Sequence, residues 1–289
     1  MKKWITGVLA ILLGVMSIAV PFSGMHIAEA KTTEETDRKL NIVTTIFPEY
    51  DWTRNILGNR ESDVNLTMLL DNGTDLHSFQ PAVKDIMKVS SCDLLIYVGG
   101  ESDQWIEDAL ESAQNKDMKT INLMEVLGDT IKEEETVEGM QDKESYQTNA
   151  ENYKAKLSTL DQKYQETVDT DRQNTLIFAD RFAFRYLVDD YGLNYYAAFS
   201  GCSAESEASF KTVTFLAGKL DEQGIKTVLT IEKSDDRIAQ TVIENTKKKD
   251  QKILELNSMQ SITSKDIENG FTYLSVMENN LENIKTALN

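Results

Sequence analysis

The chain has 289 residues, of which 30 are basic and 48 are acidic, so its formal net charge at pH 7 is −18. This acidity argues against nucleic acid as a partner, because nucleic-acid binding depends mainly on lysine and arginine side chains that neutralise phosphates. The length is sufficient for one large domain or two ordinary ones, and the order of the predicted elements favours two.

The amino terminus has the order of a secretory signal. Met1–Lys3 is basic, Ile5–Val20 is apolar, and Ala28–Ala30 is rich in small residues. We expect residues 1–30 to be an export signal. An uncleaved membrane anchor is the alternative, because the apolar run is close to the ~20 residues that a membrane span requires. The mature protein is therefore expected in the periplasm or on the outer face of the cell membrane.

Residues 31–145 alternate short β-rich runs with helical patterns, which is typical of a mainly parallel sheet built from βαβ units. The expected strands are Leu40–Phe47, Val64–Leu70, Leu94–Val98 and Thr120–Leu123, and the expected helices are Glu49–Leu57, Val83–Ser90 and Ser102–Ser112. We predict an amino-terminal α/β lobe over this range.

The stretch at residues 146–172 is predicted to be a single connecting helix. Large apolar side chains recur in it at spacings of three and four, which places them on one helical face: Tyr153, Leu157, Leu160 and Tyr164. No proline or glycine interrupts the stretch, so we expect a stiff connection and not a flexible linker.

Residues 173–289 repeat the plan of the first lobe. The expected strands are Thr175–Phe178, Tyr195–Phe199, Thr227–Ile231 and Ile253–Leu256, and the expected helices are Phe184–Asp190, Glu207–Gln223, Asp236–Thr246 and Tyr273–Leu288. The predicted fold class is α/β, with two lobes that each contain a mainly parallel sheet flanked by helices, joined by one long rigid helix. We expect ligands to bind in a cleft between the lobes, at the carboxyl ends of the strands.

His77 is the only histidine outside the expected signal, and it follows a short turn at Asn72-Gly73. Neutral imidazole is the commonest metal ligand in proteins, so His77 is a candidate ligand at the strand edge that faces the cleft. A surface or capping histidine is the alternative, because one histidine alone does not make a metal site.

Carboxylates follow two strands of the second lobe. Asp180 comes directly after the strand that begins at Thr175. Glu205 and Glu207 follow the next strand, and the amide residue Asn257 follows the last strand. Together with His77 these residues offer nitrogen and oxygen ligands for zinc or manganese. Each also has a structural alternative: Asp180 as an ion-pair partner of a nearby arginine, the two glutamates at the start of a helix, and Asn257 in a turn.

The two cysteines, Cys92 and Cys202, could form a disulfide in an exported protein or remain buried thiols. Nucleophilic catalysis has little support, because the chain has no Gly-x-Ser-x-Gly elbow and any catalytic triad would need His77 from the other lobe. We therefore do not expect an enzyme.

Taken in order, five segments resemble the solute-binding proteins of bacterial zinc and manganese ABC transporters. The resemblance includes an Asp-Leu-His-Ser-Phe segment in place of the family's Asp-Pro-His-aromatic segment, and a closing helix with the pattern Tyr-x-x-x-Met-x-x-Asn-Leu. The segments are Asp75–Pro81, Cys92–Glu101, Asp180–Tyr186, Glu205–Ser209 and Tyr273–Leu281.

The resemblance implies a metal site that this chain alters. His77 matches the metal-binding histidine of the family, but the Asp-x-His-x-Trp segment that supplies a second histidine is missing before Tyr146. The third ligand falls on Asp180 or Arg181, and we choose Asp180 because arginine does not bind cations. The family's aspartate after the last strand is replaced by Asn257. Glu205 or Glu207, with water, would complete an oxygen-rich site.

The function implied by the resemblance is the capture of a divalent ion, Zn²⁺ or Mn²⁺, between the lobes and its delivery to an ABC permease in the membrane by a monomeric protein. Such binding weakens at acid pH, because His77 must be deprotonated to act as a ligand. The alternatives are a degenerate relative with weak metal binding that serves as an adhesin or scaffold, and a cryptic enzyme.

Overall fold

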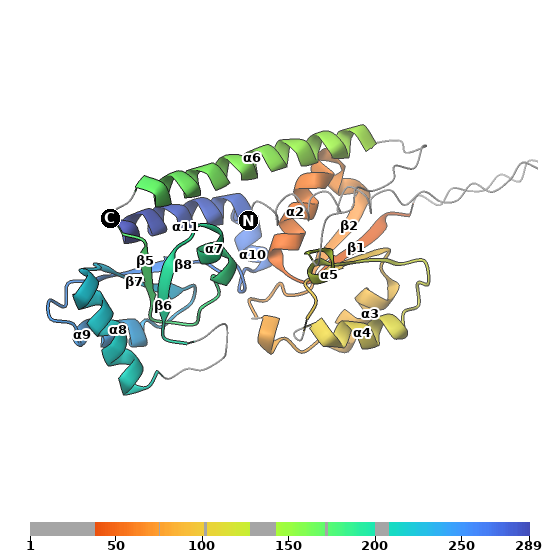
Figure 1. The fold of residues 1–289 in the computed structure, drawn as a ribbon. Coiled ribbons are helices and arrows are strands. Elements are labelled where there is room, and N and C mark those ends of the chain that lie inside the picture. The colour runs from red at the N-terminus through yellow and green to blue at the C-terminus, as the bar shows by residue number, and fades with distance from the viewer. Residues whose placement is uncertain (1–37, 75, 101–102, 128–142, 171–172, 200–207) are drawn as a thin grey trace, which may run out of the picture. The chain divides into compact units, whose positions relative to one another are not determined.

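The computed structural model describes residues 38–74, 76–100, 103–127, 143–170, 173–199 and 208–289, and for His77 it describes the backbone only. The expected signal, Cys202, Glu205 and Glu207 lie outside the described residues. In the part of the chain that is described, no helix is both long and apolar enough to cross a membrane. The described chain divides into two compact units (Figure 1), which we treat separately.

The amino-terminal unit contains a four-stranded, entirely parallel sheet with the order β2-β1-β3-β4. Every residue of β3 is buried, because this central strand is covered on both faces. The strands end one to three residues before the predicted ends. Their bounds are β1 Leu40–Thr44, β2 Val64–Met68, β3 Leu94–Tyr97 and β4 Lys119–Asn122.

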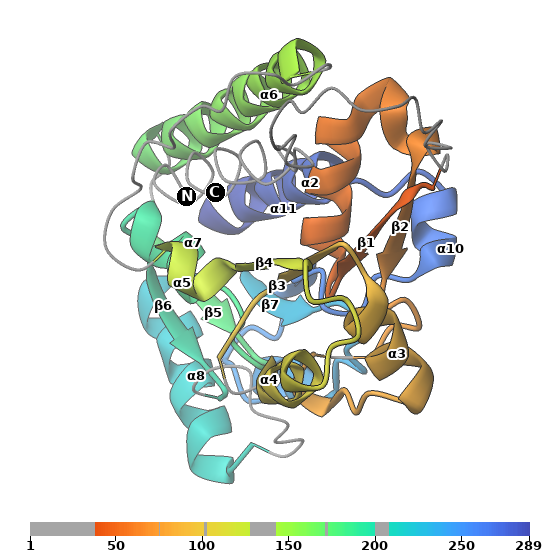
Figure 2. The ribbon, with the colours of Figure 1, turned by 90° about the vertical axis from the view of Figure 1, so that its right-hand side faces the viewer.

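Helices cover this sheet as the βαβ pattern predicts. Helix α2 packs on β1 and β2, and α3 packs on β1 and on α4 (Figure 2). Pro48 lies in the first turn of α2. Backbone N–H groups in a first turn have no partner within the helix, so proline costs no hydrogen bond there. The bounds are α2 Phe47–Leu57, η1 Gly58–Asp63, η2 Leu76–Ser78, α3 Val83–Ser91, α4 Gln104–Glu111 and α5 Leu123–Leu127.

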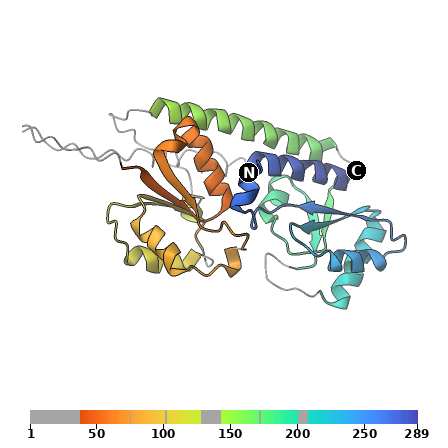
Figure 3. The ribbon, with the colours of Figure 1, turned by 180° about the vertical axis from the view of Figure 1, so that it is seen from behind.

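The expected connecting helix is found as α6, Lys143–Thr170. The division between the units falls inside it, between Lys154 and Ala155. In the carboxyl-terminal unit, α6 lies beside α11 (Figure 3), and the buried hydroxyl of Tyr164 donates to the carbonyl of Met277 at 2.7 Å. The predicted apolar face of α6 thus packs against α11 in this unit.

The sheet of the carboxyl-terminal unit has the order β6-β5-β7-β8 and is also parallel throughout, so it repeats the topology of the first. Strands β5 and β7 are central and buried at every position, whereas the outer strands are only partly covered. The bounds are β5 Thr175–Phe178, β6 Asn194–Ala197, β7 Thr227–Ile231 and β8 Lys252–Leu256.

Helices α8 and α9 share one apolar cluster with β5 and β7, and α11 packs on β5, β7 and β8. Helix α8 begins where Ser209 accepts a hydrogen bond from the backbone N–H of Thr212, and it ends at Gly224 in the left-handed conformation. The bounds are α7 Arg185–Asp190, α8 Phe210–Gln223, α9 Arg237–Glu244, α10 Ser264–Glu268 and α11 Tyr273–Leu288.

The predicted fold class is confirmed: each unit is a parallel sheet flanked by helices. One segment departs from the predicted organisation. Asp71–His77, which follows β2, belongs to the carboxyl-terminal unit. The reason is a local backbone pairing, in which Asn72 forms an antiparallel bridge with Thr263 and Ser264 N–H donates to the carbonyl of Asp71.

Candidate metal site

The carboxyl ends of β5 and β7 form the switch point of the second sheet. The chain moves outward from β5 to β6 on one side and from β7 to β8 on the other, so the two connections leave in opposite directions. Open parallel sheets bind their ligands at such a point, because the diverging loops leave a crevice there. The strand order alone therefore predicts a binding site at the carboxyl ends of β5 and β7.

Asp180 lies at this point, two residues beyond the end of β5. Its Oδ1 accepts a hydrogen bond of 2.7 Å from the backbone N–H of Arg181, which fixes the carboxylate at the strand end. Arg185, a nearby arginine that could pair with Asp180, forms an ion pair with Asp189 one helical turn along instead. The carboxylate of Asp180 lines a cavity, as a ligand there must.

Glu232 is a second carboxylate at this edge, and the sequence reasoning missed it. It follows β7 directly and is 8% exposed. Ser258 donates to it twice, from its backbone N–H at 2.7 Å and from its hydroxyl at 2.8 Å, and the Ser261 hydroxyl adds a longer bond at 3.3 Å. The signal that could have found it is its position as the first residue after a central parallel strand.

The cavity between these strand ends has a volume of ≈ 270 Å³. Both anionic and cationic side chains line it. The anionic ones are Asp180, Glu232 and Asp235, and the cationic ones are Arg181, Lys233 and Arg237. Lys233 has a positive φ of 59°, a conformation that non-glycine residues adopt at a cost, and such residues tend to gather at functional sites.

The segment that carries His77 is fastened next to this cavity. Gly73 has a φ of 75°, and a Cβ at this position would lie 2.6 Å from the Nζ of Lys233 and 3.2 Å from the carbonyl oxygen of Ser261. A side chain here would be strained at this φ and would displace the end of Lys233, so glycine suits this close approach. His77 follows four residues later in η2, and its side chain lies outside the described part of the structure.

Asn257 is engaged in the turn after β8. Its Oδ1 accepts a hydrogen bond of 2.8 Å from the backbone N–H of Met259. Its backbone is held by Asn280 of α11, whose side chain accepts from the N–H of Asn257 at 2.8 Å and donates to its carbonyl at 2.9 Å. The turn alternative considered for this residue is thus present, and a role for Asn257 as a ligand stays a prediction.

The described residues do not by themselves form a complete coordination shell. Among them, no group of three His, Cys, Asp or Glu side chains is close enough to hold a metal ion. The donors that would add to Asp180 are the side chains of His77, Glu205 and Glu207, none of which is described. Within the described part of the site, the carboxylate oxygens of Asp180 could bind a metal ion, and they supply only part of a coordination shell.

The equivalent edge of the amino-terminal sheet carries two buried carboxyl groups. Oε2 of Glu49 accepts from Thr45 N–H at 2.9 Å, from the Thr45 hydroxyl at 3.0 Å and from Ile46 N–H at 3.2 Å. Burial raises the pKa of Glu49 to about 8, against the lowering effect of these bonds, and Asp103 raises it further. A carboxyl group that holds its proton at neutral pH is a poor metal ligand.

Asp103 resembles Glu49 in its surroundings. One oxygen accepts from Gly99 N–H at 2.8 Å, and burial raises the pKa of the carboxyl group. The second carboxyl oxygen of each residue, Oε1 of Glu49 and Oδ1 of Asp103, is buried without a hydrogen-bond partner in the described structure. We do not place the ion at this edge, because neither group opens into a described cavity.

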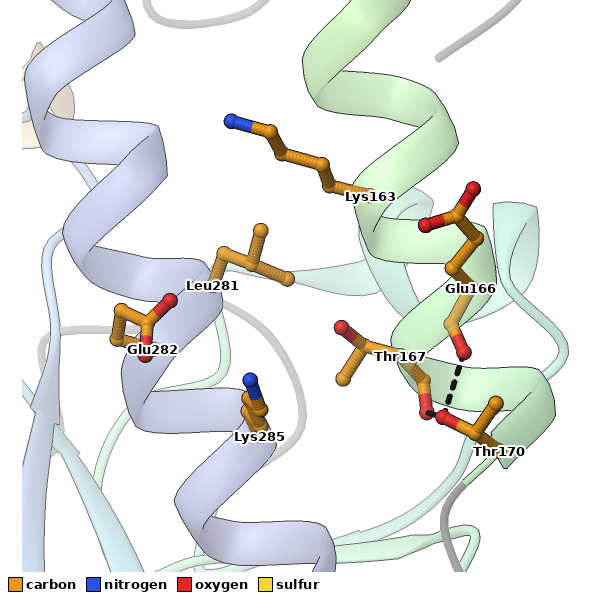
Figure 4. Close-up of a pocket in the computed structure, with 7 residues that line it drawn as sticks. All are labelled: Lys163, Glu166, Thr167, Thr170, Leu281, Glu282 and Lys285. Atoms are coloured by element: carbon orange, nitrogen blue, oxygen red, sulfur yellow. Dashed lines mark hydrogen bonds between the residues drawn. The ribbon is translucent and has the colours of Figure 1, made fainter.

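A larger cavity of ≈ 390 Å³ lies between α6 and α11 (Figure 4). Its charged side chains are exposed, and the Thr170 hydroxyl donates to the carbonyls of Glu166 and Thr167 one turn back. Lys163 and Lys285 also line it. It lacks the position at strand ends and the buried carboxylate that mark the cavity beside Asp180, so we do not assign the site to it.

Cys92 is a free, buried thiol. Its Sγ lies 3.2 Å from the carbonyl of Val89, and burial raises its pKa to about 12. A thiol that keeps its proton neither attacks electrophiles nor binds metal readily, so Cys92 belongs to the core and not to the site.

Comparisons with known proteins identify the family and several relatives of this chain. The family model "Zinc-uptake complex component A periplasmic", named ZnuA, matches residues 42–142 and 122–287. The zinc-binding protein AdcA of Streptococcus pyogenes serotype M6 is 26% identical over 95% of this chain. The chain spans 61% of that relative's length.

Two further relatives match over most of their own length. The high-affinity zinc uptake system protein ZnuA of Bacillus subtilis is 25% identical, with 86% of this chain and 88% of that protein covered. The crystal structure of the Zn(II)-bound ZnuA-like domain of Streptococcus pneumoniae AdcA superposes with a TM-score of 0.68 at 27% identity, covering 87% of this chain and 99% of that one. The chain belongs to the family of ZnuA, the periplasmic component A of zinc-uptake complexes.

Proposed function

We propose that this chain is an extracytoplasmic solute-binding protein that captures a divalent transition metal, zinc or manganese, and delivers it to an ABC permease in the membrane. The observation that carries the proposal is the cavity at the switch point of the second sheet. Two carboxylates, Asp180 and Glu232, line it, and the segment with the only histidine of the expected mature chain is fastened beside it.

The proposed ligands are His77, Asp180 and either Glu205 or Glu207, with water. Imidazole nitrogen and carboxylate oxygen suit zinc and manganese, and the absence of thiolate from this set makes the site oxygen-rich. Glu232 serves as a support, because its oxygens already accept three hydrogen bonds from Ser258 and Ser261. It fixes the turn after β8 against the end of β7. The role of Asn257 is the weakest of the predicted set, since its amide oxygen already accepts from Met259.

Calorimetry on chelator-stripped protein tests the proposal. We expect saturable binding of one zinc or manganese ion, and a loss of affinity of at least about tenfold in His77→Ala and in Asp180→Asn, because each removes a ligand that nothing replaces. Glu111→Gln, an exposed change on α4, serves as the control. If neither ion releases heat or raises the unfolding temperature of the parent, the transport proposal loses its basis.

A second candidate rests on the sequence. The Asp-x-His-x-Trp segment that supplies a ligand in the family is missing before Tyr146, as a degenerate relative that serves as an adhesin or scaffold would allow. The same calorimetry separates the two, because a scaffold would bind neither ion with micromolar or tighter affinity.

A further inference from the structure

The outer surface of helix α3 combines exposed apolar and basic side chains, although the chain as a whole carries a net charge of −18. Val83 and Met87, one turn apart, are 75% and 60% exposed. Lys84 and Lys88 follow them at the same spacing and are also exposed. The only acidic residue of this helix, Asp85, is buried and accepts a backbone hydrogen bond at the start of the helix. An apolar row and a basic row therefore lie side by side on α3.

Helix α4 lies next to α3 and exposes the opposite charge. The connections β2-α3-β3 and β3-α4-β4 cross the sheet in the same direction, so right-handed crossovers place both helices on one face of it. The two helices pack on each other, and the N–H of Gln114 beyond α4 donates to the carbonyl of Ser90 at 2.9 Å (Figure 2). Glu107 and Asp108 are exposed in the middle of α4. The same layer thus carries a basic row and an acidic row.

These opposite charges are not paired with one another. The Nζ of Lys88 lies 3.9 Å from the Oδ1 of Asp85, which is longer than a hydrogen bond. Within the described residues, Lys84, Glu107 and Asp108 form no ion pair. Both charged rows and the apolar row between them are therefore available to a partner.

We propose that the outer face of α3 and α4 is a docking surface for a second copy of this chain. This α3–α4 face consists of Val83, Lys84, Met87, Lys88, Glu107 and Asp108. In a two-fold dimer a surface meets itself, so the lysine row of each copy opposes the carboxylates of the other, and this complementary contact is made twice. The two apolar rows cover each other at the centre of the contact.

A membrane surface with anionic lipids is the other partner that exposed apolar and basic side chains could suit. Only two lysines of the face would attract it, and the two carboxylates beside them would repel it. A second copy complements both charged rows, so it is the better fit. We expect a weak dimer with a dissociation constant of roughly 0.1 mM, because two short helices per copy bury less than the ~1,200 Å² of a standard interface.

Sedimentation equilibrium of the expected mature protein, residues 31–289, tests the inference in buffer with a chelator, so that no metal bridges two copies. We expect the parent to dimerise below about 1 mM. Lys84→Glu/Lys88→Glu should remain monomeric, and so should Glu107→Lys/Asp108→Lys, because attraction across the two-fold axis becomes repulsion. An equimolar mixture of the two variants should form a heterodimer, since their reversed rows complement each other again.

The matched control makes the same charge reversals on exposed residues of the carboxyl-terminal unit. Its two variants are Lys247→Glu/Lys248→Glu and Glu278→Lys/Glu282→Lys. They have the same net charges as the α3–α4 variants, so an effect of overall charge would appear in both pairs; we expect them to dimerise like the parent. Met87→Ser leaves the charge unchanged and should weaken the dimer by about tenfold, because a buried apolar side chain is lost from each copy.

The inference is overturned if the parent stays monomeric, or if it dimerises and the α3–α4 variants dimerise equally well. A monomeric parent that sediments with vesicles of phosphatidylglycerol and phosphatidylethanolamine would assign the face to lipid and would also overturn it. Unfolding curves establish that each variant is folded, and the single reversals Lys84→Glu and Glu107→Lys replace a double variant that is not. The outcome is independent of metal binding, so the proposed function stands or falls separately.

Discussion

Glu49 is a carboxylic acid with no exposed surface, held by three hydrogen bonds at the end of β1. Its pKa is raised from 4.5 to about 8, chiefly by burial. Between these values the folded protein holds a proton that the unfolded chain releases. Folding is therefore favoured at low pH, and this contribution is lost as pH rises through about 8.

We predict that Glu49→Gln removes this pH dependence. Glutamine resembles the protonated acid and can still accept from Thr45, so the variant should be about as stable as the parent at pH 5. At pH 9 it should be more stable by a few kcal/mol, since one pKa unit corresponds to about 1.4 kcal/mol. Urea unfolding at both pH values measures this. The exposed Glu111→Gln is the control, and a difference between parent and Glu49→Gln that does not change with pH would contradict the assignment.

At the scale of elements, helix α11 holds the turn that follows β8. Asn280 is completely buried, and its amide accepts from the N–H and donates to the carbonyl of Asn257. This explains the asparagine in the closing pattern Tyr-x-x-x-Met-x-x-Asn-Leu: one side chain satisfies two backbone groups where the strand ends. The turn that it fixes also places Ser258 against Glu232.

Asn280→Ala should destabilise the protein by about 2–4 kcal/mol, because two backbone groups lose their partners and a cavity remains. Asn283→Ala is the matched control, since Asn283 lies on the same helix and donates only one bond, to the carbonyl of Glu255, in an exposed setting. Denaturant unfolding of both variants compares the two losses. Equal losses would show that Asn280 does not hold the turn.

For the whole molecule, the sequence was sufficient to predict both parallel sheets and the long helix, because apolar runs and periodicity report local structure directly. The ends of β1 and β2 were predicted too far along. After Thr44 and Met68 the chain still makes backbone hydrogen bonds, Leu69 to Thr44 and Leu70 to Thr45, but no longer follows the ladder. These turns contain apolar residues, so their sequence pattern resembles that of a strand.

The site was harder to predict because it depends on contacts between distant residues. The bridge between Asn72 and Thr263, which fastens the histidine segment to the carboxyl-terminal unit, joins backbone groups and leaves no trace in residue type. Glu232 was overlooked for a related reason. Its importance comes from the strand order β6-β5-β7-β8, which puts it at the switch point beside Asp180, and strand order is not written in local patterns.

We propose that His77 and Asp180 bind one divalent ion, and anomalous diffraction can locate that ion. Crystals of chelator-stripped protein grown with one equivalent of zinc would be measured at the zinc absorption edge. We expect one strong anomalous peak, with a ring nitrogen of His77 and a carboxylate oxygen of Asp180 both about 2.0–2.2 Å away. A map with no peak there, or a peak coordinated by neither residue, would contradict it.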